Sequence, residues 1–348
     1  MPRGGLNLKA TSILALLILV GVIVVYRISA QTGQNISRPV PKNTLVSEME
    51  MDQVALTAQS ECPYSVNPTN VYSRYSTQWK LNVNVCNKCI NFPKATLKTQ
   101  FGDTPIFIYQ SASDVWVSGV IKTTGHFEAA KTNGIAALLQ TDSNLNLIDI
   151  GANIGVHTLA IAKMGRKVLA VEALDKNIQH LCASVTAGDM QHDVTIVYNA
   201  ISDGHMRVKL GVDKNNMGGT YVDVDSKHIK DLKEGRAQGT YGEVDTITMD
   251  DLVELPVFKN FSKVIVKMDI EGFEHKAISK SEKFFKAVDV QAFIMEWEFH
   301  RKMSSGGDIL KRMKDLKFEP YRVENPSARL SVESSDSWPY DVLWRPAK

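Results

Sequence analysis

Acidic residues follow apolar segments at several points from residue 145 onward. Asp149 follows LNLI, Asp269 follows KVIVKM, and Glu296 lies in FIMEWE. Side chains of a strand alternate between its two faces, so Lys267 and Asp269 are predicted to share a face. Carboxylates that meet at the ends of neighbouring strands can take a proton from a substrate or hold a hard divalent cation.

A glycine turn begins at the first of these acids, in the segment DIGANIG from Asp149 to Gly155. A dinucleotide site would have the pattern G-x-G-x-x-G, and a triphosphate site would have a lysine after the loop; the spacing here is G-x-x-x-G. S-adenosylmethionine carries no phosphate and needs a tight turn, an acid near its ammonium group and an acid for its ribose. Asp149 and Glu172 can fill these two roles, although Gly151 and Gly155 could also do no more than connect a strand to a helix.

Segments of strand length alternate with helical segments from residue 145 onward. The expected strands are 145–150, 167–172, 194–198, 263–269 and 292–297, and the expected helices are 156–164, 175–187 and one through ILKRMKDL. This alternation predicts a parallel sheet with helices on both faces. Two late strands, near Tyr321 and Val342, are predicted to close an antiparallel edge. The expected fold is therefore α/β, with a doubly wound, mostly parallel, seven-stranded sheet, and the polar, glycine-rich segment 214–243 is interpreted as an insertion or loop.

Five separated segments also carry a resemblance to a known family. LIDIGANIG, VLAVEAL, NAISD, VIVKMDIEGFE and FIMEWE occur in this order, and residues 119–320 resemble the FkbM family of S-adenosylmethionine-dependent O-methyltransferases. The resemblance implies a Rossmann-like class I methyltransferase fold, S-adenosylmethionine as cofactor and methylation of hydroxyl groups, including those of sugars. It places Glu128, the acid of an aromatic-Glu pair, near the cofactor, and Asn153 fits the family's own turn. The expected cofactor site comprises Glu128, Asp149, Gly151, Asn153, Gly155, Glu172 and Ser202.

Methyl transfer to a hydroxyl is an in-line displacement that requires alignment of the reactants and removal of the hydroxyl proton. The expected catalytic residues are Asp269, Glu271, Glu296 and His300. Two mechanisms remain open: Asp269 or His300 is the general base, or Asp269 and Glu296 hold Mg²⁺ or Mn²⁺, which would acidify the hydroxyl. Lys267 is expected to form a buried ion pair with Asp269 or Glu271 rather than to act in catalysis.

Three further residues could have either a role in the site or a structural role only. Glu274 and His275 could belong to the site or to a solvated helix face. His157, at the start of a helix, could contact substrate or only pack there.

The N-terminal region predicts a membrane-anchored protein. Residues 10–26 contain no charged residue and have about the minimum length for a bilayer span. We interpret them as an uncleaved signal anchor, with a cleaved signal peptide as the alternative. The expected organisation is a short tail (1–9), the anchor (10–26), a flexible stem (27–65), an extension of the catalytic domain (66–140) and the methyltransferase domain (141–348). A single-pass type II topology would place the catalytic domain in the lumen of the Golgi.

Cysteines, sequons and charge refine this picture. An oxidising compartment would allow one disulfide among Cys62, Cys86 and Cys89, with Cys182 alone. Asn260-Phe-Ser262 is a glycosylation sequon, and Asn35, also in a sequon, lies close to the predicted span. The formal net charge is +2, without a cluster of Lys and Arg, so nucleic acid is not an expected partner.

The function predicted from these features is S-adenosylmethionine-dependent methylation of a hydroxyl, with a glycan of the secretory pathway as acceptor. If the domain faces the cytosol, a small-molecule or lipid hydroxyl becomes the expected acceptor. A non-catalytic lumenal scaffold with a methyltransferase fold is a further alternative, and a nucleotide-dependent oxidoreductase is disfavoured by the glycine spacing.

Overall fold

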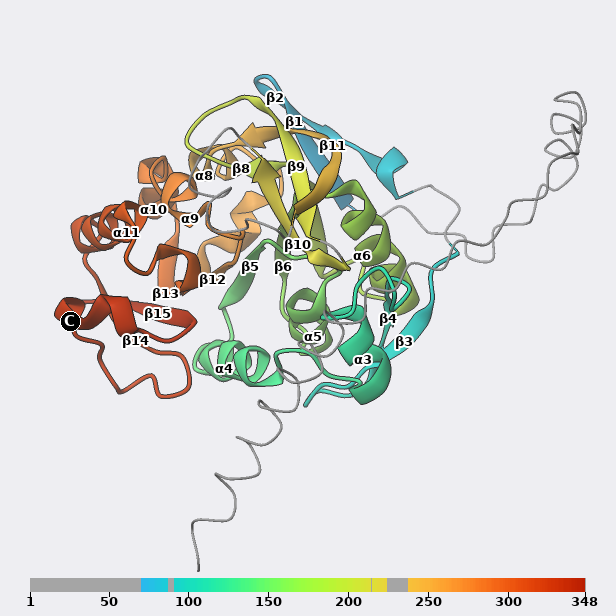
Figure 1. Ribbon diagram of the computed structural model, residues 1–348, viewed down its shortest axis with the longest axis horizontal. Helices are drawn as coiled ribbons and strands as arrows, with labels where there is room; N and C mark the ends of the chain where they lie inside the picture. Colours follow the sequence, from blue (N-terminus) through green and yellow to red (C-terminus); the bar gives the residue numbers. More distant parts are fainter. Residues whose placement is uncertain (1–69, 87–90, 214, 224–236, 348) are drawn as a thin grey trace, which may run out of the picture. The chain divides into compact units, whose positions relative to one another are not determined.

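The main sheet has nine strands in the order β14-β15-β13-β12-β5-β6-β7-β1-β2. The computed structural model describes residues 70–86, 91–213, 215–223 and 237–347 (Figure 1). The strands of this sheet are β1 (Asn70–Tyr75), β2 (Gln78–Leu81), β5 (Asn146–Ile150), β6 (Val168–Glu172), β7 (Val194–Tyr198), β12 (Lys263–Met268), β13 (Asp289–Glu296), β14 (Phe318–Arg322) and β15 (Asp341–Pro346). The run from β1 through β7, β6, β5 and β12 to β13 is parallel, whereas β2, β14 and β15 pair antiparallel. The mostly parallel sheet and its late antiparallel edge are confirmed.

The predicted total of seven strands is two too low, because β1 and β2 extend the sheet beyond β7. The strand β1 was not predicted because its sequence is polar. Arg74 is buried there because its guanidinium lies 3.1 Å from the carboxylate of Asp251, and its backbone N–H donates to Asn199 Oδ1. A buried charge is tolerated when it is paired in this way.

Helices cover both faces of the sheet (Figure 1). They are α3 (Ser118–Thr124), α4 (Ala129–Gln140), α5 (Val156–Lys163), α6 (Asp175–Ala187), α8 (Met249–Leu252), α9 (Glu274–Ala277), α10 (Glu282–Ala287) and α11 (Ser304–Asp315), with short 3-10 turns η1 (Val83–Val85), η2 (Phe258–Phe261), η3 (Glu298–His300) and η4 (Val332–Ser337). Neighbouring residues of β5 belong to different cores: Leu147 packs with residues of α4, α5 and α6, and Ile148 with residues of α8, α10 and α11. This separation is the alternation expected of a strand buried on both faces.

The end of α5 and the start of α6 are set by backbone geometry. Gly165, which has a φ of 83°, follows the end of α5 and permits the left-handed turn there. Asp175 is the first residue of α6, and Leu174 takes the capping position without a side-chain hydrogen bond.

The segment interpreted as an insertion or loop contains strands instead. A second sheet has the order β10-β9-β11-β8, formed by β8 (Ala200–Ile201), β9 (Arg207–Asp213), β10 (Asn216–Asp223) and β11 (Ala237–Ile247). The glycines of this sheet lowered its predicted strand propensity, but one of them has a packing role. A Cβ at Gly211 would lie 2.4 Å from the ring of Tyr221. A third, two-stranded sheet pairs β3 (Lys94–Leu97) with β4 (Thr104–Phe107).

The prediction that Cys182 stands alone is wrong. Cys86 is bonded to Cys182, with their Cα atoms 5.8 Å apart, so η1 is tied to α6 across 96 positions of sequence. Proximity along the sequence suggested a pair among the first three cysteines, but the fold brings η1 against α6. Cys62 and Cys89 lie outside the described residues.

The predicted tail, anchor and stem (1–9, 10–26 and 27–65) and the Asn35 sequon also lie outside the described residues. Within the described part of the chain, none of the helices has both the length and the apolar character of a bilayer span.

Candidate functional site

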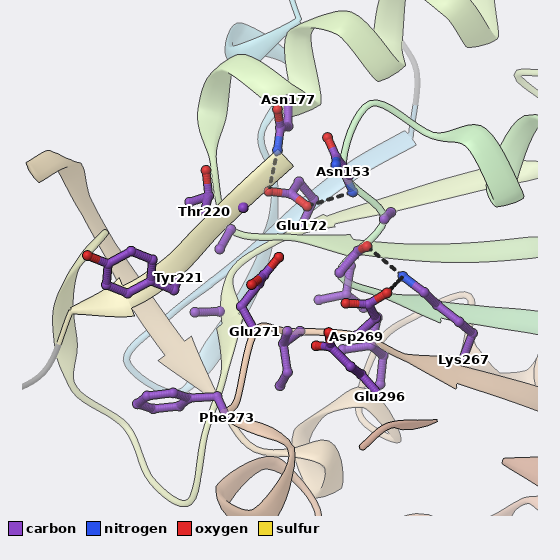
Figure 2. Close-up of a pocket in the computed structure, with 18 of the residues that line it drawn as sticks. Asn153, Glu172, Asn177, Thr220, Tyr221, Lys267, Asp269, Glu271, Phe273 and Glu296 are labelled. Carbon is purple, nitrogen blue, oxygen red and sulfur yellow. Dashed lines mark hydrogen bonds and ion pairs between the residues drawn. The ribbon is translucent and has the colours of Figure 1, made fainter. Parts of the chain in front are cut away.

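A cavity of about 220 Å³ lies where the parallel strands of the main sheet end (Figure 2). It is lined by residues 150–153 at the end of β5 and in the turn that follows, by Glu172 of β6, by residues 199–201 after β7, by Asp269 after β12, and by Glu296 of β13. The chain passes from β5 to β6 on one side and reaches β12 on the other, so β5 marks the switch point of the sheet. Ligands of open α/β sheets bind at such a point.

The structure brings most of the predicted site residues together at this cavity and leaves four outside it. The cavity is lined by Glu128, Gly151, Asn153, Glu172, Asp269, Glu271 and Glu296. Asp149, Gly155, Ser202 and His300 are not among its lining residues.

The turn after β5 makes a close contact that only glycine permits. Gly151 has a φ of 79°, and a Cβ at this position would lie 1.8 Å from the backbone oxygen of Asp269. Gly155 has a different role, because a Cβ there would lie 2.3 Å from Leu181 Cδ1 of α6. The first glycine therefore brings two strand ends together beside the cavity, and the second allows helix packing.

Glu172 is held by three donors at the edge of the cavity, and Figure 2 shows those from Asn153 and Asn177. The backbone N–H of Asn153 donates to Oε2 at 2.8 Å, and Oε1 accepts from Leu174 N at 2.8 Å and from Asn177 Nδ2 at 3.1 Å. Burial raises the pKa of the Glu172 carboxyl, although these hydrogen bonds act in the opposite direction. Asn177, whose Oδ1 accepts from the Tyr109 hydroxyl at 2.7 Å, has no motif that would have revealed it. The result is a fixed carboxylate that can accept hydrogen bonds from a diol.

Asp149 lies behind the turn and does not line the cavity. Its side chain is fully buried, Oδ2 accepts from Thr158 Oγ1 at 2.7 Å, and Oδ1 lies 3.4 Å from Lys267 Nζ. Lys267 in turn donates to the backbone oxygen of Gly151 at 2.8 Å. The expected ion pair between Lys267 and Asp269 is present at 3.8 Å, but Asp149 is the nearer partner.

A buried lysine that the sequence did not single out joins three acids. Lys131 Nζ lies 3.0 Å from Glu128 Oε1, 3.4 Å from Asp269 Oδ2 and 3.0 Å from Asp341 Oδ1. Burial opposes its charge, but the three carboxylates raise the pKa of Lys131 well above its usual value. A lysine on a helix is ordinarily solvated, so its sequence position carried no signal of this role. Lys131 ties α4 to the ends of β12 and β15.

The two acids that contact Lys131 at the cavity are held in their ionised forms. Burial acts against the charge of Asp269, but the ammonium groups of Lys267 and Lys131 lower the pKa of its carboxyl. Burial likewise opposes the charge of Glu128, and the hydrogen bond with His157 together with Lys131 lowers its pKa. His157 Nε2 lies 3.1 Å from Glu128 Oε2, and its Nδ1 lies 2.9 Å from Thr132 Oγ1. His157 lines the cavity, and both of its ring nitrogens have protein partners.

Glu296 differs from these acids. Its side chain lines the cavity and is 4% exposed, and its Oε2 has no hydrogen-bond partner among the described residues. Burial, followed by the charges of Asp269, Glu271 and Glu274, raises the pKa of Glu296 well above its usual value.

His300 was expected to act in catalysis, but its position argues against contact with a substrate. Its Nε2 lies 2.7 Å from Glu274 Oε2, and its Nδ1 lies 2.9 Å from Ser305 Oγ. The solvated reading of Glu274 is wrong as well, because this side chain is fully buried and accepts from Ile270 N at 2.7 Å. The Glu274–His300 pair therefore supports the turn after β12.

Ser202 is also away from the cavity lining. Its backbone N–H donates to the oxygen of Ile247 at 2.8 Å, where β8 and β11 pair, and its side chain is buried.

The acids of the cavity do not fit the predicted metal site. No three His, Cys, Asp or Glu side chains of the described residues form a group that could hold a metal ion. The carboxylate of Asp269 lies near two ammonium groups, those of Lys131 and Lys267, which would repel a cation placed beside it.

Comparison with known proteins gives a family for this part of the chain. The family model described as the methyltransferase FkbM domain matches residues 149–320. No curated protein matches the sequence.

Several solved structures are similar to the chain at low identity. An S-adenosylmethionine-dependent O-methyltransferase from Thermotoga maritima has 13% identity, with 80% of this chain and 86% of that chain covered at a TM-score of 0.35. The O-methyltransferase from Bacillus cereus, in complex with S-adenosylhomocysteine, has 8% identity, with 64% and 83% covered at a TM-score of 0.33. The CcbJ methyltransferase from Streptomyces caelestis has 9% identity, with 68% and 98% covered at a TM-score of 0.37. The match that bears on the family of the chain is therefore the one between residues 149–320 and the methyltransferase FkbM domain.

Proposed function

We propose that the protein transfers a methyl group from S-adenosylmethionine to a hydroxyl group, with a glycan of the secretory pathway as acceptor. The proposal that S-adenosylmethionine is the methyl donor rests on the fixed carboxylate of Glu172. This carboxylate lies beside the Gly151 turn, in a cavity at the switch point of the sheet. A carboxylate in this place accepts hydrogen bonds from ribose hydroxyls. When bound, the cofactor supplies an electrophilic methyl group on a positively charged sulfur.

The residues of the chain would hold and orient the reactants. Glu172 binds the ribose, the turn around Gly151 gives the backbone close access to the cofactor, and Glu128 contributes negative charge near the sulfonium. The acceptor would enter at the other end of the cavity, where Asp269, Glu271 and Glu296 lie. A carboxylate of the chain can remove the hydroxyl proton there.

Transfer is tested with S-adenosylmethionine that carries a trideuterated methyl group, incubated with the purified full chain and a panel of uncharged methyl glycosides. We expect mass spectrometry to show one trideuteromethyl group on a glycoside, and NMR to place it on oxygen. Label on a small-molecule or lipid hydroxyl, with no labelled glycoside, would contradict the glycan acceptor. S-adenosylhomocysteine binding without label on any hydroxyl would favour the scaffold alternative.

Glu172→Gln is expected to weaken binding of S-adenosylhomocysteine roughly 10- to 100-fold, because a hydrogen bond to a charged group contributes about 1.5–3 kcal/mol. Isothermal titration calorimetry measures this change. Glu324→Gln, an exposed acid in the loop after β14, is the matched control and should bind as the wild type does. Equal affinity in the Glu172 variant and the control would remove Glu172 from the site.

The proposed lumenal location rests on the apolar segment 10–26 and the polar stem behind it. Asn260 is exposed on η2, so a glycosylated chain should shift in a gel after glycosidase treatment, and Asn260→Gln should abolish the shift. Asn325-Pro-Ser327 has the same spacing but a blocking proline, so Asn325→Gln is the control. Digestion of the domain by protease added to sealed microsomes would contradict a lumenal location.

A further inference from the structure

The acids around the cavity differ in whether their carboxyl oxygens have hydrogen-bond or ion-pair partners, and this difference suggests different roles for them. We propose that Glu296 takes the proton from the acceptor hydroxyl, while Asp269 remains an ionised anchor between Lys131 and Lys267. This assignment rests on the proposed methyl transfer. It replaces both mechanisms expected from the sequence, the base at Asp269 or His300 and the metal at Asp269 and Glu296.

The other candidate bases are committed to protein partners. Asp269 Oδ2 lies between two ammonium groups, at 3.4 Å from Lys131 and 3.8 Å from Lys267. A carboxylate stabilised in this way is a poor proton acceptor, as its lowered pKa shows. His300 has partners on both ring nitrogens and lies outside the cavity lining.

Two more acids are excluded by position or solvation. Asp341, in register with Glu296 across β13 and β15, is paired with Lys131 and does not line the cavity. Glu271 lines the cavity but is only half-buried, so water can screen its charge. Glu296 alone among these acids combines a place in the lining, near-complete burial and a side-chain oxygen without a partner among the described residues.

The surroundings of Glu296 make it a strong proton acceptor. Asp269, Glu271 and Glu274 face it from the end of β12 and the segment that follows, and Lys131 of α4 is the cation that acts on it. The Tyr340 hydroxyl is also close: burial and then the charge of Glu296 raise the pKa of Tyr340. Burial among carboxylates favours the neutral form of Glu296, and a cation bound in the cavity favours the ionised form. Glu296 would therefore lose its proton when the positively charged cofactor binds.

The charges then balance through the reaction. The bond between sulfur and the methyl carbon breaks, and its electron pair stays on sulfur. The methyl carbon bonds to the acceptor oxygen, and the proton of that hydroxyl passes to Glu296. The buried site changes from an ion pair to two neutral groups, and Glu296 keeps this proton until the next positively charged cofactor binds.

Proton release on binding tests the assignment without any acceptor. S-adenosylmethionine is titrated into the full chain at neutral pH in two buffers of different ionisation enthalpy, and S-adenosylhomocysteine, which lacks the positive sulfur, is the reference. We expect the wild type and Asp289→Asn, at the exposed start of β13, to release a proton with the first ligand only. Glu296→Gln should release none. Unchanged release in Glu296→Gln, or release abolished only by Asp269→Asn, would overturn the assignment.

The same variants are then compared in transfer to the glycoside that the wild type labels. Glu296→Gln should lower the rate about 10²- to 10⁴-fold, the usual contribution of a general base, with S-adenosylhomocysteine affinity and melting temperature unchanged. Glu296→Asp should keep the proton release and recover part of the rate. Wild-type rates in Glu296→Gln would refute the role of Glu296, whereas failure of the wild type to bind either ligand would refute the proposed function itself.

Discussion

Gly151→Ala is expected to abolish binding of S-adenosylhomocysteine and to lower the free energy of unfolding by about 2–5 kcal/mol. Part of this loss, about 1–2 kcal/mol, is the cost of a left-handed backbone in a residue with a Cβ. The rest is overpacking, for which about 1–3 kcal/mol is usual: the new Cβ would lie 1.8 Å from the backbone oxygen of Asp269. Either the turn after β5 or the end of β12 must move, and both line the cavity.

Gly165→Ala is the matched control for this prediction. Gly165 has a φ of 83°, close to the 79° of Gly151, but no atom lies within 4 Å of a Cβ built on it. Urea denaturation and ligand titration of both variants separate backbone strain from the close contact. We expect Gly165→Ala to lose only about 1–2 kcal/mol and to bind ligand normally. Equal losses in the two variants would show that the contact at Gly151 is not what the site requires.

Lys131→Met is expected to lower the free energy of unfolding by about 3–5 kcal/mol at neutral pH, the usual effect of removing one partner from a buried ion pair. The side chain is 7% exposed and contacts the carboxylates of Glu128, Asp269 and Asp341. Methionine has a similar length, so the change mainly removes the charge. Lys122→Met, on the exposed side of α3, is the control and should change stability little.

The effect of Lys131→Met should also depend on pH. The pKa values of Glu128 and Asp269 are lowered in the folded protein, so their ion pairs stabilise it above their unfolded pKa values, which are about 4. This contribution is lost as the pH falls below that value, because the carboxylates become protonated in both states. Urea denaturation between neutral and acid pH should therefore show the difference between wild type and variant narrowing. A difference that stays constant with pH would mean that Lys131 acts through packing alone.

Local patterns in the sequence were enough to predict four of the strands beside the cavity, but not β10, whose residues Thr220 and Tyr221 also line it. Each of the strands β5, β6, β7 and β12 is a short apolar segment bounded by turn residues, and Glu172 and Asp269 were predicted as acids at the ends of β6 and β12. Glu172 was predicted from its place at the end of the second strand, and Gly151 from the spacing of the turn. These features depend on residues close together in sequence, which is why alternation and spacing reveal them.

Features that depend on distant contacts could not be predicted in this way. Lys131 is a site residue only because α4 packs beside the ends of β12 and β15. His300 had a residue type and a sequence position that suit a general base, but both of its ring nitrogens have hydrogen-bond partners, Glu274 and Ser305. The strand β10 contains two adjacent glycines that lower strand propensity, and its pairing with β9 and packing of buried side chains outweigh that signal.

The most direct test of whether the cavity is a methyltransferase site is a titration of the full wild-type chain with S-adenosylhomocysteine. NAD is the comparison ligand. We expect S-adenosylhomocysteine to bind with one-to-one stoichiometry and NAD to give no heat of binding, because the turn lacks the middle glycine of a pyrophosphate site. NAD binding, or a folded chain that binds neither ligand, would contradict a methyltransferase site at the ends of β5 and β6.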